Sequence, residues 1–188
     1  MEIRPATVED ADAVQRLRKH AWRARYLHPS TGVTKEVLEN ELAVLPPTQQ
    51  DLGRYSSMLA DPRNQGRNLV AVVDQRVVGT VTYGRREDGT GDTGVFVAED
   101  FNGTGVGDAL LQSLLRGTDE PLEVAVFACN PSREFYRRHG FEESGPESIH
   151  QFRAGVSLPV QVLRLSRPAR STGREGGGPG GSTGQASP

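Results

Sequence analysis

Hydrophobic residues recur at helical spacing through the first part of the chain. Apolar side chains at positions 13, 14, 17 and 21 repeat every three or four residues after Thr7, which predicts a helix of about 16 residues. A second apolar repeat follows Thr34, a residue type favoured at helix starts, and stops at Pro46-Pro47. A third and weaker helix is expected over residues 49–59. The N-terminal region is therefore predicted to be mainly helical.

From Asn68 onward the pattern changes to short β-branched and aromatic runs, which are typical of strands. Two such runs flank Asp74-Gln75 and predict a hairpin, whereas the polar, glycine-rich segment 85–91 is expected to be a loop. With an opening strand included, the expected strands cover residues 2–4, 69–73, 76–83, 94–97, 122–127, 149–152 and 160–165.

Two further helices are expected between the later strands. One follows the glycine-rich turn and reaches about Arg116, and the other starts at Pro131 and ends at Gly140. Strands that alternate with helices predict one α/β domain over residues 1–166. Residues 167–188 are rich in glycine, proline and serine and offer no apolar surface, so a disordered tail is expected there.

The segment of the sequence that most strongly indicates a function is a glycine-rich turn between a short strand and an amphipathic helix. Gly103, Gly105 and Gly107 leave backbone N–H groups uncovered where a helix begins, an arrangement that suits a phosphate or pyrophosphate. A dinucleotide fingerprint is excluded because Asp108 stands where its third glycine would fall, and a P-loop is excluded because no lysine follows the turn. The turn therefore predicts a site for a phosphate-bearing cofactor of another kind.

Composition excludes several classes of protein. The formal net charge of −2 argues against a dedicated nucleic-acid binder, and the single cysteine, Cys129, rules out an internal disulfide. The start of the chain does not resemble a secretory signal, and no stretch approaches the roughly 18 apolar residues of a membrane span. The four histidines show no metal-binding spacing, so we expect a metal-free, soluble, cytoplasmic protein that binds neither membrane nor nucleic acid.

Three short motifs carry a resemblance to a known family. The turn reads Asn102-Gly-Thr-Gly-Val-Gly107, the segment after the fifth strand reads Asn130-Pro-Ser-Arg-Glu-Phe-Tyr-Arg-Arg-His-Gly-Phe141, and the chain opens with Ile3-Arg-Pro-Ala-Thr. Together they resemble the GNAT superfamily of N-acetyltransferases, in which the turn is Gln/Arg-x-x-Gly-x-Gly/Ala. The resemblance covers residues 2–166. It implies a mixed, mostly antiparallel sheet flanked by helices, with acetyl-CoA bound at a splay between the fourth and fifth strands.

The resemblance also implies which residues bind acetyl-CoA, the expected cosubstrate. Backbone N–H groups of the turn would hold the pyrophosphate. The end of the fourth strand would hydrogen-bond the pantetheine arm, and one of its N–H groups would stabilise the oxyanion. The expected cofactor-binding residues are Val95, Phe96, Val97, Asn102, Gly103, Thr104, Gly105, Val106, Gly107, Asp108, Asn130 and Tyr136.

Two positions in the turn depart from the family pattern. Asn102 replaces a longer Gln or Arg, so one side-chain contact to the phosphates is expected to be missing. Asp108 places a carboxylate in the first turn of the helix, where it should weaken anion binding unless it points away as a local cap.

The resemblance implies that an amine attacks acetyl-CoA directly within a ternary complex, and this chemistry needs two proton transfers. Tyr136 is the expected general acid, which donates a proton to the departing CoA thiolate. The general base is left open between Glu123 and Asp92, the acids that lie on or before the two central strands, or no single residue.

The acceptor is an amine of a small molecule or a peptide, and its identity is not encoded in any motif. Trp22, Tyr26 and His28 lie where the first helix meets a loop, in a region that shapes the acceptor pocket in relatives, and are the expected substrate-binding residues. A homodimer is left open. The alternative function is a catalytically idle CoA-binding or interaction module on the same fold.

Overall fold

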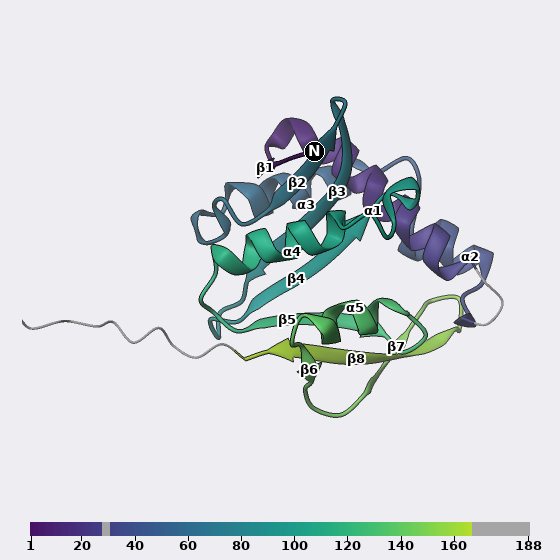
Figure 1. The fold of residues 1–188 in the computed structure, drawn as a ribbon. Helices are drawn as coiled ribbons and strands as arrows, with labels where there is room; N and C mark the ends of the chain where they lie inside the picture. The colour runs from purple at the N-terminus through teal and green to yellow at the C-terminus, as the bar shows by residue number, and fades with distance from the viewer. Residues whose placement is uncertain (28–30, 167–188) are drawn as a thin grey trace, which may run out of the picture.

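The computed structural model describes residues 1–27 and 31–166, so His28 and the expected tail at 167–188 lie outside the described residues. Eight strands form one sheet in the order β1-β2-β3-β4-β5-β8-β6, with β7 paired to β8 (Figure 1). The strands are β1 (Glu2–Pro5), β2 (Leu69–Val73), β3 (Arg76–Arg85), β4 (Gly91–Val97), β5 (Leu122–Phe127), β6 (Glu142–Glu143), β7 (Ser148–Gln151) and β8 (Ser157–Leu165).

The longer helices are α1 (Ala11–Tyr26), α3 (Gln49–Ala60), α4 (Val106–Arg116) and α5 (Ser132–Arg138), and short 3₁₀ turns cover Val8–Asp10, Pro62–Asn64 and Glu99–Phe101. The predicted first, third and fourth helices are thereby confirmed. In these ranges no helix is long and apolar enough to cross a bilayer.

Every strand pair of the described sheet is antiparallel except β4–β5. The expectation of a mixed, mostly antiparallel sheet flanked by helices is therefore confirmed. The β2–β3 hairpin turns at Asp74 and Gln75, whose φ angles of 47° and 63° are those of a type I′ turn. Such a turn matches the right-handed twist of the two strands that it joins.

Helices cover both faces of the sheet. On one face α4 packs against β2, β3 and β4, and its Leu110 and Leu111 are fully buried in the main core. On the other face α1 packs against β3 and β4, while α3 packs on α1, with Val14 and Tyr55 in a separate core cluster. The sheet thus separates two layers of helices, and its central strands β3 and β4 contact helices of both layers.

The second predicted helix differs from expectation. Only Lys35–Val37 (α2) is α-helical, with the Thr34 hydroxyl as its N-cap, and the chain continues as a π-helix over Leu38–Leu42. The Ala43 N–H closes that wider turn by donating to Leu38 O at 2.7 Å. A short apolar repeat fits either turn, because the two differ by a single residue in the hydrogen-bonded ring, so the pattern alone could not distinguish them.

The predicted loop at 85–91 is also shorter than expected. β3 runs to Arg85 and β4 starts at Gly91, and the Arg86 N–H closes the remaining loop on Thr90 O at 2.8 Å. Gly91 lowers the strand signal, but a Cβ there would lie 2.4 Å from the Tyr83 ring. This glycine therefore marks a close approach inside the sheet rather than a turn.

The C-terminal strands are confirmed with two additions. β6, a two-residue strand, was not predicted, and β8 begins at Ser157 rather than at Val160. Pro131 occupies the N-cap of α5 instead of its first helical position. Gly140, with a φ of +84°, ends that helix as predicted.

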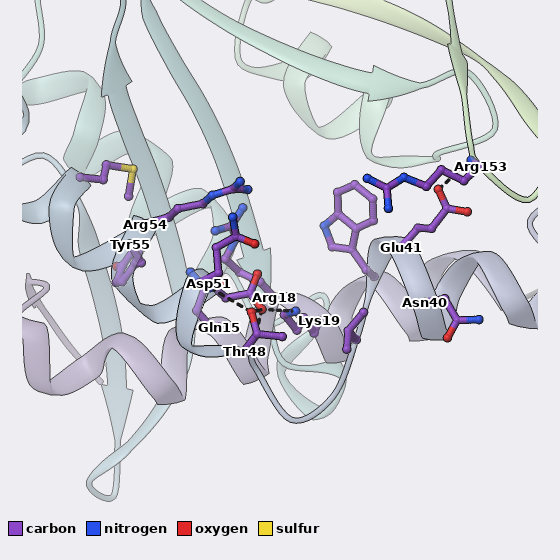
Figure 2. A pocket seen from close by; sticks show the side chains of 14 residues that line it. Gln15, Arg18, Lys19, Asn40, Glu41, Thr48, Asp51, Arg54, Tyr55 and Arg153 are labelled. Atoms are coloured by element: carbon purple, nitrogen blue, oxygen red, sulfur yellow. Dashed lines mark hydrogen bonds and ion pairs between the residues drawn. The ribbon is translucent and has the colours of Figure 1, made fainter.

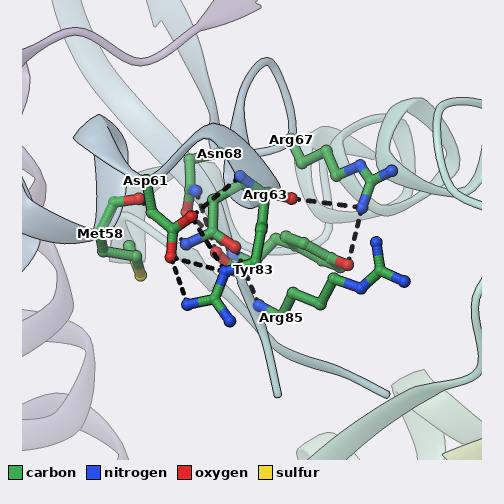
Figure 3. Close-up of polar contacts among 8 residues, drawn as sticks. Met58, Asp61, Arg63, Arg67, Asn68, Tyr83 and Arg85 are labelled. Atoms are coloured by element: carbon green, nitrogen blue, oxygen red, sulfur yellow. Dashed lines mark hydrogen bonds and ion pairs between the residues drawn. The ribbon is translucent and has the colours of Figure 1, made fainter. Parts of the chain in front are cut away.

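A polar network holds the end of the sheet at which β4 and β5 still pair (Figure 3). The Asn68 side chain donates to Tyr83 O at 3.0 Å and accepts from the Tyr83 N–H at 2.8 Å. Arg67 donates to the Tyr83 hydroxyl at 2.8 Å and to Glu120, just before β5, at 2.9 Å. These contacts link β2, β3 and the start of β5.

Candidate functional site

β4 and β5 are neighbours in the sheet but pair over only two residues. The parallel register joins Gly91 to Leu122 and Asp92 to Glu123, and within the described chain it extends no further. β4 remains paired with β3 up to Val97, and β5 remains paired with β8 to its end. The two strands therefore diverge into the splay that the family resemblance predicts.

The inner edge of β4, the edge that faces β5 rather than β3, carries backbone N–H donors that point into this splay. N–H groups along an antiparallel strand alternate between its two edges. Because the Ala98 N–H donates to Val78 O at 2.8 Å on the β3 side, the N–H groups of Val95 and Val97 point the other way. The Val95 N–H donates to the Tyr136 hydroxyl at 3.0 Å.

Tyr136 enters the splay from α5. It is only 3% exposed and belongs to the main core. Burial raises the pKa of its hydroxyl to about 12, although the hydrogen bond from Val95 lowers it in part. The phenol is therefore protonated at neutral pH, with its oxygen bonded to Val95 and its proton available to another acceptor.

The glycine turn presents unpaired donors at the start of α4. Gly103 and Gly105 have φ angles of +76° and +87°, which side chains other than glycine rarely adopt, and Gly105 is the N-cap. The first N–H of the helix with a backbone acceptor is that of Ala109, which donates to Gly105 O at 3.0 Å. Within the described residues, the N–H groups from Gly105 to Asp108 have no hydrogen-bond acceptor, an arrangement that suits an anion.

Side chains of the turn contribute less than its backbone. The Thr104 hydroxyl donates to Phe101 O at 2.7 Å, and the Val106 side chain is 3% exposed and packed in the core. At Val106 only the backbone N–H can contact a ligand, whereas the Thr104 N–H, like its hydroxyl, donates to Phe101 O. Asn102 is exposed beside the turn, and its side chain forms no hydrogen bond with any residue in the described ranges.

Asp108 is paired rather than aimed at the turn. Its carboxylate lies 3.2 Å from the Nε2 of His139, whose Nδ1 is 2.9 Å from Phe135 O. The ring thus faces one oxygen acceptor on each side and links the ends of α4 and α5. The Asp108 carboxylate therefore has a side-chain partner on α5, which sequence reasoning did not identify.

A cleft of about 1590 Å³ connects the turn, the inner edge of β4 and the C-terminal half of α1. Arg25 and Arg138 also line it, and neither forms an ion pair with a described residue. Both lie in the last turns of helices, Arg25 in α1 and Arg138 in α5. This position at a helix end is the sequence feature from which they could have been predicted. Of the expected cofactor-binding residues, the cleft is lined by Val95, Phe96, Val97, Asn102, Gly103, Gly105, Gly107, Asp108 and Tyr136.

The two candidate bases lie together at the closed end of the splay. Asp92 and Glu123 are direct partners across the β4–β5 pair, and Arg86 forms ion pairs with both carboxylates. The Glu123 side chain is 14% exposed and also lies 3.5 Å from Arg164. Asp92 is 55% exposed, and partial burial raises the pKa of its carboxyl while Arg86 opposes the shift.

Asn130 lies at the end of β5 but does not line the cleft. Its Nδ2 donates to the Tyr26 hydroxyl at 2.6 Å, and its Oδ1 accepts from the Ser132 N–H at 2.9 Å at the start of α5. Asn130 thus positions Tyr26, which lines the cleft beside Trp22. The Trp22 and Tyr26 rings are 5.4 Å apart, and both contact Phe127 of β5.

These features fit acetyl-CoA, an elongated ligand with phosphates at one part and an amide-containing arm at another. Unpaired N–H groups on the turn suit the pyrophosphate, and the unpaired edge of β4 suits the amides of the arm. Arg25 and Arg138 line the same cleft, and guanidinium groups suit phosphate. Within the described residues no three histidine, cysteine or acidic side chains gather as a metal site would require.

Residues 64–143 match the family model of the acetyltransferase (GNAT) domain. Among curated proteins no sequence matches the chain. A ribosomal-protein-alanine N-acetyltransferase from Brucella melitensis is 27% identical, with 88% of this chain aligned to 99% of that one and a TM-score of 0.61.

Two more distant structures share the fold and contain the cofactor. A protein from Salmonella typhimurium with its cofactor acetyl-CoA is 22% identical over 88% of this chain and 92% of that one, with a TM-score of 0.64. A PaiA N-acetyltransferase from Thermoplasma acidophilum in complex with coenzyme A is 13% identical over 87% and 98%, with a TM-score of 0.62.

Proposed function

Since the chain is an acetyltransferase of the GNAT superfamily, we propose that it transfers the acetyl group of acetyl-CoA to a primary amine of a small molecule or peptide. Acetyl-CoA supplies the acetyl group as a thioester. The amine attacks it directly within a ternary complex, so the protein contributes position, polarity and proton transfer rather than a nucleophile.

The proposed polarising group is the Val95 N–H. It points into the splay because β4 alternates its donors between two edges, and β5 has already diverged at this level. A fixed backbone donor of this kind stabilises negative charge as it develops on a carbonyl oxygen. The Val97 N–H, two residues further along the same edge, is proposed to bond the arm of the cofactor.

Tyr136 is proposed as the general acid for the departing thiolate. Its hydroxyl is already within 3.0 Å of the Val95 N–H, so acid and polarising donor act at one place. The high pKa of the phenol, about 12, keeps it protonated throughout the neutral range. A thiol with a pKa near 8.5 needs only modest assistance, which a phenol can provide.

Asp92 is the better placed of the two candidate bases. Its raised pKa makes it a stronger proton acceptor, whereas Glu123 is more enclosed and held between two arginines. Asp92 is three residues from Val95 along β4, or roughly 10 Å at the usual strand rise, so the proton would pass through water. Trp22 and Tyr26 are proposed to border the acceptor, as the family resemblance implies.

The observation that carries this proposal is the Val95–Tyr136 hydrogen bond in a splay that adjoins an unpaired glycine turn. Calorimetry with acetyl-CoA, followed by thiol release over a panel of amines, tests it. Saturable binding and amine-dependent thiol release are expected. Binding without turnover on a broad panel would instead indicate a catalytically idle CoA-binding module, and absence of any binding would overturn both.

A further inference from the structure

A second pocket, of about 640 Å³, lies on the face of the sheet opposite α4. It is lined by residues of α1, α3, the π-helix and the turn between β7 and β8 (Figure 2). The Arg153 and Ala154 N–H groups of that turn donate to the Glu41 carboxylate at 2.8 and 3.0 Å. These bonds attach the turn to the π-helix, and the pocket volume is that of a small-molecule site.

Positive charge in this pocket exceeds the negative charge available to balance it. Asp51 accepts from Lys19 at 2.8 Å, and Glu41 is occupied by backbone N–H groups. Three arginines, Arg18, Arg54 and Arg153, form no ion pair with any residue in the described ranges. Figure 2 shows Arg54 and Arg153 reaching toward the pocket from opposite sides.

Arg18 has the least compensated charge of the three. Its guanidinium carbon lies 5.1 Å from the centre of the Phe96 ring, and its Nε is buried without a hydrogen-bond partner. Burial lowers the pKa of this guanidinium, and electrostatic interactions with Tyr55, Asp51 and Asp92 act against the shift. A buried donor without an acceptor is costly, and a planar carboxylate matches the fork of a guanidinium with two parallel hydrogen bonds.

The pocket is adjacent to the proposed reaction centre. Phe96 follows Val95 on β4, lines the cofactor cleft and supports the Arg18 guanidinium. Trp22 lines both the cleft and the pocket. A molecule in the pocket can therefore extend past Trp22 toward the splay while its other end contacts Arg18.

We propose that this pocket is the acceptor site and that it selects small amines that also carry a carboxylate, which Arg18 binds. The inference rests on the proposed acetyl transfer to an amine. Arg54 and Arg153 surround the bound carboxylate, and the Lys19–Asp51 pair forms the wall between α1 and α3.

Matched acceptors test this selectivity. The value of kcat/KM at saturating acetyl-CoA is measured for 4-aminobutyrate and 6-aminohexanoate, each beside its carboxamide, which has the same length and amine but no charge. At least one carboxylate is expected to exceed its carboxamide by about tenfold or more, as a charge-assisted hydrogen bond in a partly buried site implies. Equal values for both members of each pair would overturn the inference.

Variants locate the effect. Arg18→Met retains the length of the side chain, should reduce the carboxylate preference to near one, and should leave the carboxamide within about threefold of wild type. Arg18→Lys should restore part of the preference. Arg153→Met should reduce the carboxylate preference less than Arg18→Met does. Its structural contact to Glu41 is preserved, because the backbone N–H of residue 153 makes that contact. Arg116→Met, on the exposed end of α4, is the charge-matched control and should leave the ratio unchanged.

Two outcomes separate this inference from the proposed function. Acetylation of carboxamides and carboxylates at equal rates would leave the proposed function intact and disprove the acceptor class. If no amine is acetylated, the proposed function fails, and calorimetric titration of 6-aminohexanoate then decides the inference. Binding to wild type that Arg18→Met weakens at least fivefold supports a carboxylate site, and equal binding to both proteins contradicts it.

Discussion

The Val95 N–H and the Tyr136 hydroxyl are joined by a hydrogen bond of 3.0 Å across the splay. The Tyr136 hydroxyl, the proposed acid, therefore already accepts the hydrogen bond that the Val95 N–H is proposed to donate to the substrate carbonyl. For the Val95 N–H to polarise a thioester, it must exchange its bond to Tyr136 for one to the substrate. This exchange places the phenol beside the reacting group and frees its oxygen at the same time.

Replacing Tyr136 with Phe should separate catalysis from binding. The variant loses the proton donor, so kcat should fall by about 10- to 100-fold, toward the low end for acid catalysis because a thiolate leaves readily. Acetyl-CoA should bind as tightly as in wild type or more tightly, since the Val95 N–H no longer has a competing acceptor. Steady-state kinetics and calorimetry on the same preparation measure both quantities.

The matched control is Tyr83→Phe, at a buried tyrosine whose hydroxyl contacts Arg67 outside the cleft. It should lose a comparable amount of stability and retain kcat. A fall in acetyl-CoA affinity that accounts for the whole loss of activity in Tyr136→Phe would contradict the acid role.

The pH profile should show a rising limb without an early falling limb. An alkyl ammonium with a pKa near 10 must lose its proton before attack, so kcat/KM should increase with pH up to about that value. Because burial raises the pKa of Tyr136 to about 12, the acid remains protonated over this range. Asp92→Asn should lower the plateau more than Glu123→Gln does, and a falling limb centred near pH 8 would rule out Tyr136 as the acid.

Gly105→Ala should weaken acetyl-CoA binding through the backbone. The φ of +87° at this position disfavours any side chain, and a Cβ there would meet no atom, so the cost is conformational, about 1–2 kcal/mol. A shift of the turn to relieve it would misalign the N–H groups that precede α4. Gly89→Ala, at a φ of +84° with equally open surroundings in the β3–β4 loop, is the control.

Both variants should lose similar stability, measured by thermal unfolding, and only Gly105→Ala should lose affinity, by about 10-fold or more. Equal affinity in the two proteins would show that the turn does not bind the cofactor.

The geometry of the proposed cofactor site, the strand end and the glycine turn, was predictable because its residues are close in sequence. The strand, the glycine turn and the start of α4 form one continuous segment from Val95 to Asp108, so local chemistry specifies where the donors point. Asn130 could be located in the same way, but its side chain is bonded to Tyr26 and to the start of α5, contacts that depend on tertiary structure.

The arginines of the proposed acceptor pocket were not predictable, for a physical reason. Arg18, Arg54 and Arg153 are 36 to 135 residues apart and line one pocket only because α1 and α3 pack together and Glu41 holds the β7–β8 turn. Charged residues on helices are usually solvated, so their pattern carries no sign of a shared pocket. The π-helix that presents Glu41 was equally hidden, because its apolar spacing resembles that of an α-helix.

His139→Ala should expose the effect of Asp108 on anion binding. Without the ring at 3.2 Å, the carboxylate loses the partner that holds it away from the turn, and affinity for acetyl-CoA should fall by about 3- to 10-fold, the scale of one charge at a helix N-terminus. The double variant Asp108→Asn/His139→Ala should recover most of this loss. Calorimetry on the four proteins of this cycle measures the coupling, and additive effects would show that the pair is unrelated to binding.

The Lys19–Asp51 pair should make stability depend on acid pH. Burial raises the pKa of Asp51, but hydrogen bonds from Lys19 and Thr48 outweigh it and lower the pKa to about 2. A lowered pKa means that the unfolded chain binds more protons as pH falls. The contribution is therefore complete above about pH 4 and is lost as pH falls through about 2.

Asp51→Asn should accordingly reduce the free energy of unfolding at neutral pH by roughly 1–2 kcal/mol, after allowance for the 29% exposure of the carboxylate. The difference from wild type should shrink between pH 4 and 2, because wild-type Asp51 becomes protonated there. Urea unfolding followed by the fluorescence of Trp22, the single tryptophan, measures it at each pH. Asp12→Asn, which removes the exposed ion pair between Asp12 and Arg16 of α1, is the control and should reduce the free energy of unfolding by a smaller amount. A wild-type advantage over Asp51→Asn that persists undiminished at pH 2 would show that this pair does not cause the acid sensitivity.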